Sequence, residues 1–233
     1  MKTYISTCRK FASALLALGL CTIGIGSANA LVINLADGPT NFAFSSTGGP
    51  YDLSVTGSLD ITALTATSAT LSIVLNNAST LTGGGVIANA TDARLTSFGF
   101  GINPNVTSVT FLDNDTTGMV GASLSQIPSL RQIEVCTFGG PNCSGGGNGG
   151  IAAGGFDVFS LTLTGNFNDL TALTFDPLGV KFQTKSGSFE FACSGSDCGS
   201  VAVVPEPTTI ALFGLGLLGL GAFRRKSAMK SQA

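Results

Sequence analysis

The chain has 233 residues, a formal net charge of −2, 44% hydrophobic residues and a mean hydropathy of +0.43. It contains no histidine, which excludes catalytic sites of the Ser-His-Asp and Cys-His types and removes the side chain that titrates near neutral pH. The hydropathy suits a membrane protein, but apolar residues and basic charge concentrate at the two ends, so the average describes neither the ends nor the middle.

Residues 1–30 have the three parts of a secretory signal peptide. The start is basic, an apolar run follows over residues 11–25, and Ala28 and Ala30 form an A-x-A cleavage site. The apolar run is shorter than the ~20 residues of a membrane-spanning helix, which makes a retained anchor the weaker alternative. We therefore expect export through the secretion translocon and a mature chain that begins at Leu31.

The part between the two ends is acidic. Residues 31–204 contain four basic and twelve acidic residues, which gives a net charge of −8. Nucleic-acid binding requires basic patches, so this balance disfavours it and we expect no nucleic-acid partner. Divalent cations, basic partners or simple solubility are compatible with an acidic body. The roughly 174 residues from 31 to 204 are enough to bury one core and fit one domain, and we expect that domain over residues 31–198.

Short stretches that alternate apolar and polar residues predict β-strands with one buried face. They lie at residues 70–75, 106–111, 159–164, 173–175, 179–183 and 188–191. The breaks between them carry Gly, Asn, Asp and Pro, which favour turns. We expect an all-β, antiparallel β-sandwich or jelly-roll-like domain. A weak helical pattern at residues 123–132 is interrupted by Pro128, so at most one or two short helices are predicted.

Four cysteines remain after the signal peptide: Cys136, Cys143, Cys193 and Cys198. Four thiols in an exported domain predict two disulfides, with three possible connectivities. Proximity along the chain favours pairing of the first two and of the last two, while cross pairing and free or metal-bound thiols remain alternatives. Zinc is disfavoured because the chain has neither a C-x-x-C pair nor a histidine. We expect the second disulfide to fix the chain just before its C-terminal linker.

The best metal candidates are Asp113 and Asp115, in the stretch DNDTTG. Calcium favours oxygen ligands at alternating loop positions, and Gly118 permits the bend that such a loop requires. Leu124 stands where an EF-hand needs a bidentate glutamate, so the stretch is not an EF-hand. Two interpretations stay open, a calcium loop and an Asx-rich turn after a strand over residues 106–112.

No motif in the body indicates an enzyme or a cofactor. Twelve acids allow a carboxylate pair of the kind that hydrolyses glycosides, but nothing singles out two of them, and solvated surface acids explain the same residues. The glycine-rich stretch at residues 139–150 lacks the Lys-Ser/Thr of a phosphate-binding loop and is typical of a surface loop.

The C-terminal part combines a proline-bracketed acid, an apolar run and a basic end. A linker over residues 199–207 closes with Pro205, Glu206 and Pro207. Residues 208–223 carry no charge and are marginal for crossing a ~30 Å hydrocarbon core, which suits a temporary transmembrane helix. Basic residues next to such a helix stay in the cytoplasm, so the tail over residues 224–233 is expected inside and the body outside. The basic residues are Arg224, Arg225 and Lys226.

The order of these blocks resembles the PEP-CTERM sorting signal of bacterial exported proteins, which has Pro-Glu-Pro, a Gly- and Leu-rich transmembrane segment and an Arg-rich stop. The resemblance implies recognition by an exosortase, a membrane protease that cuts at or near Pro-Glu-Pro, followed by release or transfer to the cell surface. It also implies a Gram-negative-type bacterium that makes extracellular polysaccharide. It covers about 25 residues plus the expected signal peptide and says nothing about chemistry in the body.

We therefore expect a non-enzymatic exported protein that is delivered to the cell surface or to the polysaccharide matrix of a biofilm, as a structural or adhesive component. The association with polysaccharide rests on the family resemblance alone. One alternative is a calcium-dependent carbohydrate-binding module, although the chain has no Trp and only two Tyr to stack on sugars. The other is a carboxylate-dependent glycoside hydrolase.

Overall fold

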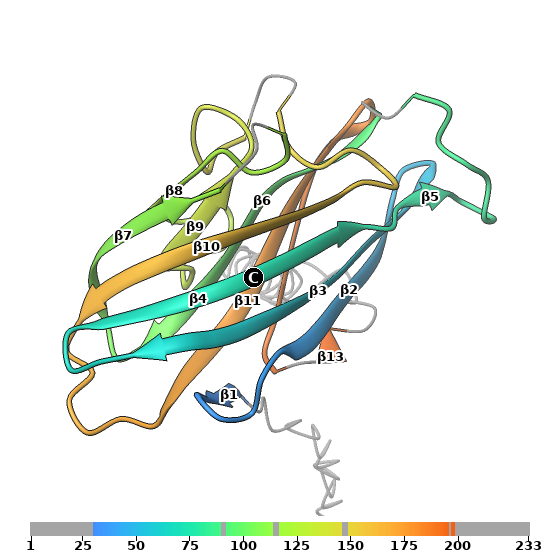
Figure 1. Cartoon of the computed structure of the whole chain (residues 1–233). Helices are drawn as coiled ribbons and strands as arrows, with labels where there is room; N and C mark the ends of the chain where they lie inside the picture. The colour runs from blue at the N-terminus through green and yellow to red at the C-terminus, as the bar shows by residue number, and fades with distance from the viewer. Residues whose placement is uncertain (1–29, 90–91, 114–116, 146–148, 196, 199–233) are drawn as a thin grey trace, which may run out of the picture.

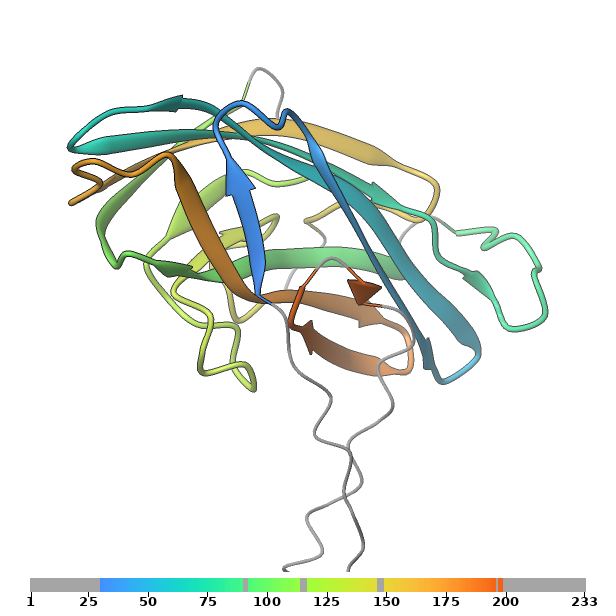
Figure 2. The same cartoon turned by 90° about the horizontal axis from the view of Figure 1, so that it is seen from below.

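A computed structural model describes residues 30–89, 92–113, 117–145, 149–195 and 197–198. They form an all-β fold in which two antiparallel sheets pack face to face as a sandwich (Figure 1). Figure 2 shows the two sheets as separate layers. Within these ranges no helix is long and apolar enough to cross a membrane. The signal peptide up to residue 29 and the predicted sorting helix at residues 208–223 lie outside them.

The first sheet has six strands in the order β1-β11-β6-β9-β8, with β12 also paired to β11. Their bounds are β1 Leu31–Asn34, β6 Ala93–Asn103, β8 Gly121–Ser123, β9 Val135–Phe138, β11 Ala172–Thr184 and β12 Gly187–Cys193. The long strand β11 pairs with β6 on one side and with β1 and then β12 on the other, and its register with β6 shifts between Phe175 and Leu178.

The second sheet has seven strands in the order β13-β2-β3-β4-β10-β7, with the short strand β5 paired to β3. Their bounds are β2 Thr40–Gly48, β3 Tyr51–Leu64, β4 Ser68–Asn77, β5 Thr80–Leu81, β7 Val106–Leu112, β10 Phe156–Gly165 and β13 Asp197–Cys198. All pairs are antiparallel except β13 with β2. All six stretches predicted from alternation lie within strands, which confirms the all-β expectation.

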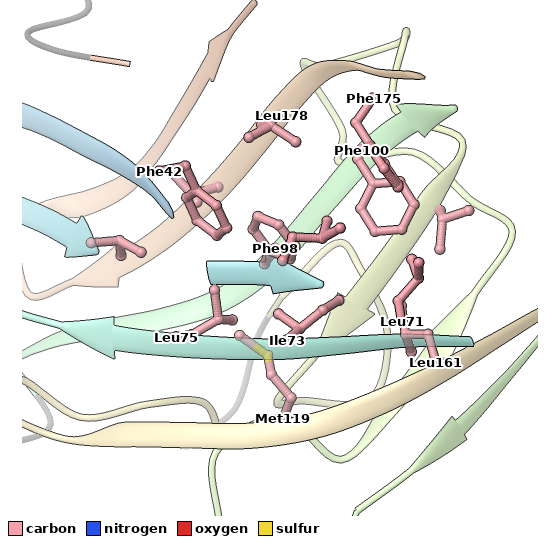
Figure 3. Close-up of a cluster of buried hydrophobic side chains, with 14 of the residues drawn as sticks. Phe42, Leu71, Ile73, Leu75, Phe98, Phe100, Met119, Leu161, Phe175 and Leu178 are labelled. Carbon is pink, nitrogen blue, oxygen red and sulfur yellow. The ribbon is translucent and has the colours of Figure 1, made fainter. Parts of the chain in front are cut away.

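The core lies between the sheets and is rich in phenylalanine (Figure 3). Phe42 of β2 stacks on Phe98 of β6 with ring centroids 5.2 Å apart and planes 7° apart. Phe100 meets Phe175 edge-on at 5.3 Å. Aromatic pairs in these geometries attract each other more than the buried area alone would predict. The stacked pair joins the two sheets and therefore helps to fix their relative position.

The predicted helix at residues 123–132 is wrong. This part of the chain leaves β8 and makes two successive turns, in which Leu130 N–H donates to Ile127 O at 2.8 Å and Ile133 N–H donates to Leu130 O at 3.1 Å. Ile127 and Ile133 are buried with Cys136 and Cys143 in a second, small core. The apolar residues three apart therefore mark consecutive turns that cover this core, and Pro128 denies the donor that a helix would need.

Candidate functional site: a polar sheet face with two uncharged rows

The outer face of the second sheet carries many serine, threonine and asparagine side chains. We call the outward-facing residues of β2, β3, β4, β10 and β7 the polar face; these strands lie side by side in Figure 1. Successive side chains of a strand point to opposite faces of the sheet. In these strands the apolar side chains on one face enter the core, and many serine, threonine and asparagine side chains lie on the other face. Examples are Thr56, Ser58, Ser72, Thr110, Ser160 and Thr162.

The strand register arranges these side chains in rows that run across the sheet. One row consists of Ala43, Thr56, Asn76 and Phe156, which are direct neighbours across four strands. The next row consists of Asn41, Ser58, Val74 and Val158. Neighbouring strands lie about 4.8 Å apart, so each row is a compact line of side chains. Neither row contains a charged residue, although residues 31–204 carry a net charge of −8.

A shallow hollow of about 430 Å³ lies over these two rows. Its lining includes Asn41, Thr56, Ser58 and Asn76. Gly57 also lines the hollow. A Cβ atom at this position would lie 2.5 Å from Val74 O and 2.6 Å from the Phe42 ring, so there is no room for a side chain. Glycine thus lets the stacked Phe42 ring pack directly beneath β3.

Phe156 stands at the end of the first row and is 73% exposed, which is unusual for a phenylalanine in a strand. Val158, at the end of the second row, is also exposed. The polar face therefore offers hydroxyl and amide groups that both donate and accept hydrogen bonds, beside an apolar ring. This combination suits a neutral ligand with many hydroxyl groups.

The calcium interpretation is not tested by the structure. Asp113 follows β7, while Asp115 lies outside the described residues. Where the structure describes the chain, no three acidic, cysteine or histidine side chains come together as metal ligands.

Sequence reasoning missed Asp157, which is 2% exposed and whose Oδ2 accepts a hydrogen bond from Met119 N–H at 2.6 Å. Leu112 pairs with Ser160, so Asp113 and Asp157 lie at the same end of the β7–β10 pair. The alternation of β10 could have identified Asp157, because this residue lies on the inward side of the strand together with Phe159 and Leu161. A charged residue at a core position of a strand requires a partner, and here a backbone amide supplies one.

The predicted disulfide between Cys136 and Cys143 is confirmed, with Cα atoms 6.2 Å apart. Cys193 is also disulfide-bonded, but the side chain of Cys198 lies outside the described part, so their pairing remains a prediction. The backbone of β13 pairs in parallel with β2, which holds the chain at the sheet edge just before the linker.

The sorting residues Pro205, Glu206 and Pro207, the basic residues after residue 223 and Ala28 of the predicted cleavage site also lie outside the described ranges. Comparison with protein families supplies evidence for the C-terminal part. Residues 203–226 match the family described as the PEP-CTERM protein-sorting motif. The match covers the Pro-Glu-Pro, the apolar run and the three basic residues. Such a motif implies an exported, exosortase-processed protein that is associated with the cell surface.

The body is not assigned to a family by these comparisons. No curated protein matches the chain. Among solved structures, a GH20 exo-β-N-acetylglucosaminidase from Vibrio harveyi, in complex with N-acetylglucosamine, is similar at 10% identity and a TM-score of 0.32. The similarity covers 72% of this chain and 19% of that chain. At this level it supports no inference about fold or activity.

Proposed function

We propose that this protein, which carries a PEP-CTERM sorting motif and is exported and processed by an exosortase, is a non-enzymatic adhesive component of the extracellular polysaccharide matrix. The polar face is the part of the body that binds the polysaccharide. The motif supports delivery to the surface, and the two uncharged rows of the polar face support adhesion.

The observation that carries the adhesive role is the hollow over the two rows and the exposed Phe156 beside it. A neutral polysaccharide presents hydroxyl groups and apolar ring faces. Hydroxyl and amide side chains replace the water that such a chain loses, and an aromatic ring contacts its apolar face. Because the rows contain no charge, binding a neutral chain there does not require the desolvation of an ion.

The same geometry favours binding over hydrolysis. Glycoside hydrolysis uses two carboxylates on either side of the scissile bond. The two rows over the hollow contain none, and the carboxylates of the polar face, Asp52 and Asp60, lie on β3 outside these rows.

The proposal is tested by sedimenting the exported protein, purified from its own cells, with isolated matrix polysaccharide. A Ser58→Asp variant places a charge in the hollow and is expected to lower retention roughly tenfold, because the charge must be desolvated on binding. Ser144→Asp makes the same change at an exposed position of the disulfide loop and is the matched control. Equal retention of the wild type and Ser58→Asp rules out the polar face, and no retention of the wild type rules out the adhesive role.

A further inference from the structure

We propose that a second site, at the edge of the sandwich, binds a carboxylated sugar such as a uronate residue. The site is a cavity of about 610 Å³, within the roughly 300–1,000 Å³ range of small-molecule sites. It lies where the start of β7 meets the connection between β8 and β9, and we call it the edge groove. Its lining includes Asn105, Leu124, Ser125, Gln126, Arg131 and Glu134.

Arg131 is the cation that a ligand would meet there. Three of the four basic residues in the body are engaged: Lys181 and Lys185 form ion pairs at 2.7 and 2.8 Å, and Arg94 donates to a backbone carbonyl at 2.9 Å. Within the described part of the chain, Arg131 has no ion pair and donates no hydrogen bond. It is therefore an unengaged guanidinium at a cavity of about 610 Å³ in a body with net charge −8.

Glu134 shares the edge groove with Arg131, and the two do not form an ion pair. Oε2 of Glu134 accepts a hydrogen bond from Ile102 N–H at 3.2 Å, which holds the carboxylate against β6. Because neither charge is neutralised by the other, both side chains are available to a ligand in the groove. Such a ligand would bring an acceptor to Arg131 and a hydroxyl donor to Glu134.

The remaining lining identifies the chemical class. One guanidinium matches one carboxylate through two parallel hydrogen bonds. Asn105, Ser125 and Gln126 provide groups for sugar hydroxyls, and Leu124 provides an apolar contact. A densely charged polyanion is disfavoured because a single cation in a body with net charge −8 cannot compensate it.

A second cavity shares Glu134 with the edge groove. It has a volume of about 270 Å³, and its lining also includes Gln132, Thr174 and Asp176. In the edge groove Arg131 offsets the charge of Glu134, whereas the described lining of the second cavity has two carboxylates and no basic side chain, so another carboxylate is repelled there. The neighbouring position therefore suits a neutral sugar linked to the carboxylated one.

Calorimetry with the exported protein tests this with two disaccharides that differ in one group, glucuronosyl-glucose and its neutral counterpart cellobiose. We expect at least roughly tenfold tighter binding of the uronate, which corresponds to one strong charged contact. Arg131→Gln should abolish this preference, because it removes the charge that distinguishes the uronate from cellobiose. Lys185→Gln removes the same charge from an exposed ion pair elsewhere and should preserve the preference.

The proposal is wrong if the wild type does not distinguish the two disaccharides, or if Lys185→Gln lowers uronate binding as much as Arg131→Gln. Equally tight binding of acetate or of a peptide carboxylate overturns the assignment to a sugar. The Ser58→Asp substitution lies on the polar face, so this variant should bind the uronate like the wild type. If Ser58→Asp loses matrix retention but keeps uronate binding, the two sites are separate.

Discussion

Lys181 and Glu190 face each other across β11 and β12, with Nζ and Oε1 2.7 Å apart and side chains that are 6% and 10% exposed. Oε2 of Glu190 accepts a hydrogen bond from Ser129 N–H at 2.6 Å, which ties the β8–β9 connection to the first sheet. Burial alone would raise the pKa of Glu190, but hydrogen bonds from Lys181 and Ser129 and the lysine charge lower it, and the net pKa is below its ordinary value.

Removing the positive partner should be costly. Lys181→Met keeps the shape of the side chain but leaves Glu190 buried without its counter-charge, and we expect the free energy of unfolding to fall by about 3 kcal/mol. In Lys181→Met/Glu190→Gln the uncompensated charge is also gone, so a large part of this loss should be recovered. Urea denaturation measures both variants, and losses that simply add would contradict a coupled pair.

The same pair predicts a dependence of stability on pH. The pKa of Glu190 is lower in the folded protein than its ordinary value of 4.5, so its stabilising contribution is complete above that pH and is lost as the pH falls through the folded pKa. The stability difference between the wild type and Glu190→Gln should therefore shrink as the pH is lowered below about 4.5. A difference that stays constant from pH 7 to pH 3 would show that Glu190 does not titrate in this way.

Gly57 should not tolerate a side chain. A Cβ atom there would press on the carbonyl oxygen of Val74, which belongs to the backbone, and on the Phe42 ring. We expect Gly57→Ala to lower the free energy of unfolding by about 2 kcal/mol, as overpacking does. Gly85→Ala is the matched control, because a Cβ atom at that position has its nearest contact at an ordinary 3.4 Å. Thermal unfolding compares the two, and similar midpoints would disprove the close packing beneath the hollow.

The Cys136–Cys143 disulfide closes a loop with a sequence separation of only 7 and seals the small second core. From the loop-closure entropy of so short a loop, we expect Cys136→Ala/Cys143→Ala to lower the free energy of unfolding by about 2 to 3 kcal/mol. Denaturant unfolding measures this change. The variant keeps the disulfide of Cys193, so any further loss on adding reductant reports on that second bond. An unchanged unfolding midpoint in the variant would show that the loop is held by packing alone.

The sequence predicts the strands whose two faces differ in environment. Alternation is clear in β10, where Phe159, Leu161 and Leu163 enter the core while the residues between them face outward. It is absent in β6, since the turns and the disulfide loop cover the outer side and nearly every residue of the strand is buried. Periodicity therefore fails where a third layer covers a sheet, because both faces of the strand are then selected for burial.

The candidate site was less predictable than the fold. Thr56 and Ser58 lie in a stretch rich in serine, threonine and glycine, which resembles a loop. Only the strand register shows that Ser58 lies beside Asn41 and Thr56 beside Asn76 on one face of a sheet. Arg131 likewise becomes a candidate binding residue only because the structure places it in the edge groove and shows that the other three basic residues form ion pairs or a hydrogen bond. Such relationships depend on strand pairing, which a single sequence does not specify. The sorting motif was predictable because its blocks are local.

Mass spectrometry of the protein recovered from the medium and from the surface of its own cells, covering both ends of the chain, tests the central claim most directly. Export followed by exosortase processing predicts an N-terminus at Leu31 and a C-terminus at or near Pro205 to Pro207, with residues 208–233 removed. Recovery of a surface protein that still carries residues 208–233 would contradict it, and the protein would then be held at the membrane by its own tail.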